Sequence, residues 1–126
     1  MKNLIVDLDG TLTTLDTNDY KNVSPNIALI KKLHEYKEIG FDITIATARN
    51  MRTFSGDIGK INTHTLPVIL DWLENNDVPF DRVIVGKPWC GTDGFYIDDK
   101  SIRPSEFIKL TYDEIQNLLE QESKCY

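Results

Sequence analysis

The stretch NLIVDLDGTL, residues 3–12, decides the fold. Its run of aliphatic residues is typical of a buried strand, which we expect over Asn3–Leu8. Asp7 and Asp9 occupy alternate positions, so their side chains can point to the same side where the strand ends. Gly10 then permits a sharp turn. An isolated Asp-Gly turn beside a solvated acid fits the same residues, so the rest of the chain has to decide between the two interpretations.

Apolar runs and amphipathic stretches alternate along the rest of the chain. This alternation predicts a Rossmann-like α/β fold, with a parallel sheet and helices on both faces. Polar loops are expected over Thr11–Val23 and Arg49–Asn62. The further predicted strands cover Phe41–Ala48, Arg82–Val85, Gly94–Asp98 and Phe107–Leu110. The predicted helices run from Ser24-Pro25 to Gly40, from Thr65 to Asn75, and onward from a capping box at Thr111–Glu114.

Chain length, net charge and apolar runs predict the number of domains, the kind of partner and the compartment. A chain of 126 residues predicts one domain, residues 1–126. A net charge of −6 disfavours nucleic acid as a partner. No apolar run is long enough for a membrane span, and the first apolar stretch is too short for a signal peptide, so we expect a cytoplasmic protein. Cys90 and Cys125 lack the spacing of a zinc or redox pair.

Polar residues close four successive predicted strands. Asp7 and Asp9 follow the first, Thr47 closes the second, Lys87 follows the third, and Asp98-Asp99 ends the fourth. Each one alone also fits an ordinary loop or strand-end residue. A parallel sheet, however, gathers the carboxyl ends of its strands at one crevice, where such proteins bind ligands. Together these residues offer a hard-metal site, a phosphate cradle and a candidate nucleophile.

The motif Asp7-Leu8-Asp9-Gly10-Thr11-Leu12 resembles the first motif of the haloacid dehalogenase (HAD) superfamily of aspartyl phosphotransferases. Thr47, Lys87 and Asp98-Asp99 resemble its second, third and fourth motifs, in the same order. At finer detail the chain is similar to small, capless HAD phosphatases of bacterial capsule polysaccharide biosynthesis. That closer resemblance is carried by residues 49–52, 86–91 and 97–104.

The resemblance implies a role for each matching residue. Asp7 would be the nucleophile that takes the phosphoryl group, and Asp9 the general acid and base. Phosphate would be bound by Asp7, Leu8, Asp9, Thr47, Ala48 and Lys87. The cofactor would be Mg²⁺, held by Asp7, Asp9, Asp98 and Asp99, with Asp99 as the direct ligand of the last pair and Asp98 acting through water or from outside the first layer of ligands.

The implied activity is the Mg²⁺-dependent hydrolysis of a phosphate monoester, with a sugar phosphate of capsule biosynthesis as the expected substrate. A macromolecular phosphate remains an alternative substrate. From another class, a signalling receiver domain also carries acids, a Thr and a Lys on a doubly wound sheet, but its phosphorylated Asp follows a middle strand. A sugar transferase with a metal-binding DxD motif would not explain Lys87 with Asp98-Asp99. A HAD-like binding subunit without turnover would not need every catalytic position.

Neither loop of the predicted sheet has room for a cap domain. We therefore expect an open crevice, covered by a large substrate or by a neighbouring subunit in a homo-oligomer. The Arg49–Asn62 loop is placed to reach over the site. Trp89 is expected to pack or to line the entrance. Arg49, Arg52 and Arg103 are expected on a solvated face, with contact to an anionic substrate as the alternative.

Overall fold

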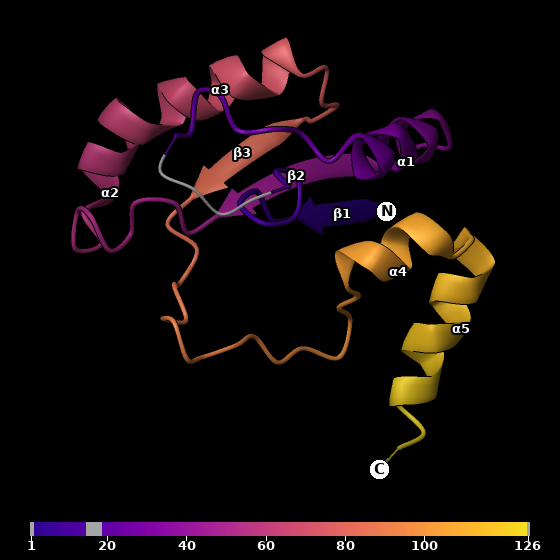
Figure 1. Ribbon diagram of the computed structural model, residues 1–126. Helices are drawn as coiled ribbons and strands as arrows, with labels where there is room; N and C mark the ends of the chain where they lie inside the picture. Colours follow the sequence, from indigo (N-terminus) through magenta and orange to yellow (C-terminus); the bar gives the residue numbers. More distant parts are fainter. Residues whose placement is uncertain (1, 15–18, 126) are drawn as a thin grey trace. The chain divides into compact units, whose positions relative to one another are not determined.

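The computed structural model describes residues 2–14 and 19–125 (Figure 1). The chain forms two compact units, one reaching to Trp89 and the other starting at Cys90. The first unit holds a three-stranded parallel sheet in the order β1-β2-β3. Its strands are β1 (Asn3–Val6), β2 (Asp42–Thr47) and β3 (Arg82–Val85). The predicted α/β class is therefore confirmed, and no segment among the described residues forms a cap domain.

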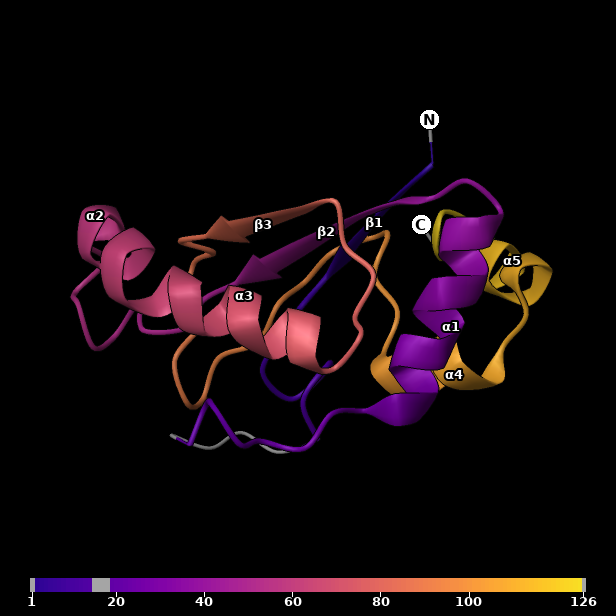
Figure 2. The same ribbon diagram turned by 90° about the horizontal axis from the view of Figure 1, so that it is seen from above.

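Helices connect the strands of the first unit and run along its sheet (Figure 2). Helix α1 (Ile27–Glu38) joins β1 to β2. Helix α3 (Leu66–Asn75) precedes β3 and follows α2 (Ile58–Lys60) and the π-helical turn η1 (Ile61–Thr65). The predicted helix from Thr65 to Asn75 is confirmed to within one residue, while the expected 49–62 loop contains α2 and the start of η1.

The start of α1 differs from the prediction. Asn26, not Ser24, is the N-cap, and its side chain accepts the Leu29 N–H at 3.2 Å. Pro25 lies outside the helix, in an isolated antiparallel bridge with Thr13. Asn26 also donates from its side chain to the Thr11 carbonyl at 3.1 Å, so the cap ties the helix to the turn that follows β1. The helix begins two residues later than predicted because Pro25 is held in the bridge with Thr13, which leaves Asn26 to cap the first turn.

The core of the first unit lies between the sheet and its two longer helices. Burial of its apolar side chains is the main term that stabilises this unit. The fully buried side chains are Leu8, Leu12, Leu29, Leu33, Ile43, Ile45, Ile61, Ile69 and Leu73. Residues at the intervening strand positions Ile5 and Ile84 are exposed.

The second unit contains helices α4 (Pro104–Lys109) and α5 (Tyr112–Glu122). The capping box at Thr111 and Glu114 is confirmed, since each residue bonds to the backbone N–H of the other. Two predicted strands are wrong: Gly94–Asp98 forms no helix or paired strand, and Phe107–Leu110 lies in and just after α4. Pro104 at the first turn and Glu106, which accepts the Arg103 N–H at 2.7 Å, start a helix there instead.

No helix among residues 2–14 and 19–125 is both long and apolar enough to cross a membrane.

Candidate active site

The residues after β1 fold into a tight turn around one carbonyl. The N–H groups of Thr11–Thr13 all donate to the Leu8 carbonyl oxygen, at distances between 2.9 and 3.2 Å. Gly10 adopts a φ of 79°, which a residue with a side chain rarely adopts. Because Leu8 is fully buried, this turn is fixed to the core. Asp7 and Asp9 are thereby held at the carboxyl edge of the sheet.

Lys87 reaches this edge because β2 and β3 continue their pairing beyond β3. The Lys87 N–H donates to the Thr47 carbonyl at 3.1 Å, one step past the paired residues Thr47 and Val85. The Lys87 ammonium nitrogen then lies 3.6 Å from the nearer Asp7 carboxylate oxygen. The third strand therefore delivers a positive charge to the acid that follows the first.

Asp7 is a half-buried carboxylate under opposing influences. Burial raises the pKa of the Asp7 carboxyl above its ordinary value, and the charge of Asp9 raises it further. The Lys87 charge and a hydrogen bond from the Leu8 N–H work the other way. Burial outweighs them, so the ionised form of Asp7 is only partly compensated by the protein. A bound cation would complete that compensation.

Thr47 ends β2 with its side chain almost fully buried. Its hydroxyl oxygen accepts the Arg49 N–H at 3.1 Å. That bond uses the oxygen only as an acceptor, so the hydroxyl hydrogen can still donate. A buried donor at a strand end suits a phosphoryl oxygen.

Asp9 is bound by Arg49 through two parallel hydrogen bonds. Arg49 Nη2 lies 2.7 Å from Asp9 Oδ1, and Arg49 Nε lies 3.1 Å from Oδ2. Arg49 is only 4% exposed, so the expectation that this side chain is solvated is wrong. A neighbouring acid across the sheet edge supplies the counter-charge that allows an arginine to be buried.

The structure thus brings Asp7, Asp9, Thr47 and Lys87 to one edge of the sheet. A haloacid dehalogenase-like hydrolase family model matches residues 4–75, which contain β1, β2 and the turn with both acids. The chain belongs to this family. A crystal structure of a protein from Vibrio cholerae is also similar, with 59% sequence identity and a TM-score of 0.95. That similarity covers 97% of this chain and 99% of the Vibrio cholerae chain. Comparison with curated protein sequences gives no match.

In this HAD-family hydrolase, the loop after β2 forms specific contacts with η1 and with Trp89. Asn50 has a φ of 62° and accepts the Thr65 hydroxyl at 2.7 Å, which joins the loop to η1. The Arg52 guanidinium lies 5.7 Å from the ring centre of Trp89, within reach of a cation–π contact. Trp89 remains 46% exposed, so an aromatic face and a positive charge stand together two residues beyond Lys87.

Asp98 and Asp99 belong to the second unit. Asp98 accepts the Lys100 N–H at 3.0 Å, and this bond lowers the pKa of the Asp98 carboxyl. Both acids line a cavity of about 180 Å³ together with Ser101, Glu106 and side chains of α5. Across residues 2–14 and 19–125, no three His, Cys, Asp or Glu side chains are grouped closely enough to hold a metal ion.

The burial of Arg49 and its bonds to Asp9 are features that the sequence does not predict. The position of Arg49 directly after the strand-ending Thr47-Ala48 was the available signal, because a residue two places beyond Thr47 shares the crevice with the acids. Its burial could not be foreseen from charge alone, since a lone arginine after a strand is usually solvated.

Proposed function

We propose that this HAD-family hydrolase is a Mg²⁺-dependent phosphatase, which hydrolyses a phosphate monoester through a phosphorylated Asp7. The observation that carries the proposal is the pairing of Asp7 with Lys87 at 3.6 Å, beside the buried Thr47 hydroxyl. A carboxylate nucleophile is repelled by a phosphate dianion unless positive charge and hydrogen-bond donors surround the phosphate. Lys87 supplies the positive charge, and the Thr47 hydroxyl supplies a hydrogen-bond donor.

In the first step, an Asp7 carboxylate oxygen forms a bond to phosphorus while the bond from phosphorus to the ester oxygen breaks. The departing oxygen keeps that electron pair and takes a proton from the Asp9 carboxyl group. In the second step, a water oxygen attacks phosphorus, and the bond from phosphorus to Asp7 breaks. Asp9 accepts the proton of that water, and inorganic phosphate leaves with Asp7 restored.

Asp7 and Asp9 offer the type of ligand atom, oxygen, that a magnesium ion binds. Hydrolases of this family generally use a divalent metal ion. Asp7 is a partly compensated, half-buried carboxylate beside a second acid, and oxygen ligands are those that Mg²⁺ prefers. The Asp7 carboxylate and the Asp9 carbonyl would hold the ion, and it would neutralise charge on the phosphoryl oxygens.

We further propose that Asp98 and Asp99 complete this metal site, with Asp99 as the direct ligand. The resemblance of Asp98-Asp99 to the fourth family motif supports this assignment. Asp99→Ala should then raise the Mg²⁺ concentration needed for half-maximal activity at least tenfold, and Asp98→Ala should raise it less. Magnesium titration of the two variants compares them directly. Equal effects of both variants, or full activity in excess chelator, would contradict the assignment.

A sugar phosphate of capsule polysaccharide biosynthesis is the proposed substrate. Residues 49–52, 86–91 and 97–104 resemble the capsule phosphatases, and Arg52 beside the exposed Trp89 supports a substrate with a sugar ring and negative charge. An aromatic face packs well against the C–H face of a sugar. A macromolecular phosphate is the alternative, favoured by the absence of a cap domain among the described residues.

The test of the reaction is the Asp7→Asn variant. The amide has the same shape but is a far poorer nucleophile, so turnover of a phosphate-ester panel with Mg²⁺ should fall below detection while the fold is retained. Unaided hydrolysis of phosphate monoesters is among the slowest known reactions, so no slow background can mask the loss. Circular dichroism checks the fold, and borohydride trapping checks for phosphorylated Asp7 in the wild type. Wild-type turnover by Asp7→Asn would exclude the mechanism.

A further inference from the structure

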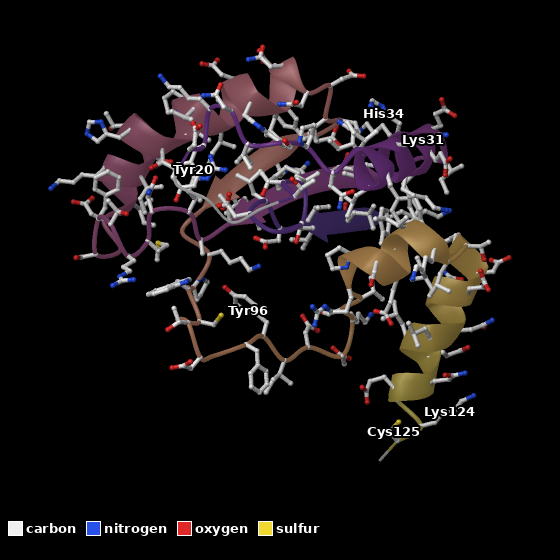
Figure 3. The ribbon with its side chains drawn as sticks, viewed as in Figure 1. Tyr20, Lys31, His34, Tyr96, Lys124 and Cys125 are labelled. Carbon is white, nitrogen blue, oxygen red and sulfur yellow. The ribbon has the colours of Figure 1, made fainter. Side chains whose placement is uncertain are left out.

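The most unusual group beside the site is the buried guanidinium of Arg49. A guanidinium keeps its charge at every physiological pH, and moving it out of water is costly unless its donors find acceptors. Here two donors bind Asp9, and the flat face lies 4.0 Å from the ring centre of Tyr20, a residue labelled in Figure 3. The backbone of the same residue is bonded to Thr47. Both ends of Arg49 are therefore fixed.

The remaining donor of the guanidinium is Nη1. Arg49 Nη1 is buried and has no hydrogen-bond partner among the described residues. Buried donors without a partner are rare, and an arginine kept only for structure is expected to have its donors occupied. The two side-chain hydrogen bonds that the structure gives Arg49 both go to Asp9, so the Asp9 contact holds this guanidinium.

Asp9 needs to be held in place. It lies in the turn beyond β1, next to Gly10 and three residues past the last paired residue of that strand. A general acid must come within about 2.6–3.2 Å of the oxygen that it protonates, and small displacements are costly. The paired hydrogen bonds of a guanidinium fix both the position and the plane of a carboxylate, which a lysine ammonium cannot do.

We propose that Arg49 is a positioning residue, which orients the Asp9 carboxyl group toward the leaving oxygen of the phosphate ester. This inference rests on the proposed phosphatase function and goes beyond it. Each hydrogen bond from Arg49 occupies one lone pair of an Asp9 oxygen. Each oxygen keeps a second lone pair, and one of these can hold the proton that Asp9 transfers. Arg49 thus acts through Asp9 and takes no part in the transfer of the phosphoryl group to Asp7.

The leaving group distinguishes this role from a structural one. 4-Nitrophenolate departs readily without a proton, whereas phenolate needs one. The two probes are therefore 4-nitrophenyl phosphate and phenyl phosphate, and the parameter is kcat/KM, which covers only the steps up to the first phosphoryl transfer. For Arg49→Met, kcat/KM should fall about 100-fold or more on phenyl phosphate and less than about tenfold on 4-nitrophenyl phosphate.

Arg82→Met is the matched control. Arg82 also forms an ion pair with an aspartate, Asp42, at 2.9 Å, but it lies at the start of β3, whereas Lys87 follows the end of that strand. This variant should keep both kcat/KM values within about twofold of the wild type. Arg49→Lys keeps the charge without the paired donors, so it should show the same preference for 4-nitrophenyl phosphate as Arg49→Met. It also provides the test if Arg49→Met does not fold.

The outcomes separate the two proposals. Equal losses on both esters, or full activity in Arg49→Lys, would overturn the positioning role while leaving the phosphatase function intact. A wild type that hydrolyses no member of the phosphate-ester panel, these two esters and sugar phosphates included, and gives no trapped Asp7 phosphate would instead refute the proposed function. In an Asp9→Ala background, adding Arg49→Met should cause no further change in the ratio of the two kcat/KM values. A further tenfold change in that ratio would also overturn the role.

Discussion

Gly86 sets the path of the chain into Lys87. Its φ is 85°, and a Cβ placed there would lie 2.5 Å from Ile58 Cδ1, at the far end of a flexible side chain. Gly86→Ala should therefore lower the free energy of unfolding by about 2 kcal/mol, mostly through the left-handed backbone. It should also lower kcat/KM at least tenfold, because Lys87 is displaced from Asp7. Urea unfolding and steady-state kinetics measure the two effects.

The Ile58→Val variant separates the two causes, since it removes only the methyl group that the new Cβ would meet. The double variant Gly86→Ala with Ile58→Val should recover less than half of the lost stability. Full recovery would show that crowding, and not the positive φ, is the larger cost at this position.

Among single residues, the sequence predicts those at strand ends but not the contacts between distant positions. The acids, Thr47 and Lys87 were placed at strand ends by the local apolar pattern, which periodicity reveals. The partner of Asp9 depends on a contact between residues 40 positions apart in the sequence. No local sequence pattern encodes such a contact, so the sequence predicts a solvated Arg49, as is usual for an arginine.

Asp81 links three elements where β3 begins. Both of its oxygens accept from the Lys37 ammonium at 2.6 Å, and one also accepts the Ile43 N–H at 2.8 Å. These bonds, that of Lys37 foremost, hold the pKa of the Asp81 carboxyl below its ordinary value. The ionised form is therefore favoured by folding. Its contribution to stability is present above the pKa of the unfolded chain, near pH 4, and is lost as the pH falls through the lower, folded value.

Asp81→Asn should thus lower the free energy of unfolding by about 1 kcal/mol at pH 7, a figure reduced because the Lys37 pair is partly exposed. The difference from wild type should shrink progressively below about pH 4. Urea unfolding at several pH values measures it. Asp71→Asn, on the exposed side of α3, is the control and should change little. A difference that stays constant down to pH 2 would contradict the role of the charge.

At the scale of elements, sequence patterns were reliable where helices and strands contact their neighbours along the chain. The βαβαβ order and the capping box of α5 were both predicted correctly. Gly94–Asp98 was read as a strand from its apolar residues, but a strand also needs a pairing partner, which composition does not reveal. The apolar residues of Phe107–Leu110 predict a strand, but Pro104 and Glu106 start a helix that includes Phe107.

At the scale of the whole molecule, both units carry exposed apolar residues. In the first unit Ile5 is 75% exposed, and in the second the run from Phe95 to Ile97 is exposed, with Ile97 at 88%. Tyr96, labelled in Figure 3, lies within that run. Large exposed apolar side chains are frequent at the surfaces where soluble proteins associate. They support the proposal that the protein forms a homo-oligomer, in which a neighbouring subunit restricts water at the open site.

Sedimentation equilibrium should therefore give a mass at least twice the 14.5 kDa of one chain. Ile97→Asp should lower that mass toward 14.5 kDa, because a buried charge without a partner disfavours association. Activity should fall with the mass and recover at high protein concentration, since mass action restores the oligomer. Asp113→Asn, an exposed change within the first turn of α5, is the control and should leave the mass unchanged. A wild type that sediments as a single chain, ignores sugar phosphates and dephosphorylates peptides would contradict this assembly and favour the macromolecular substrate. The Asp7 chemistry would stand in that case, because Asp7, Thr47 and Lys87 all lie within one chain.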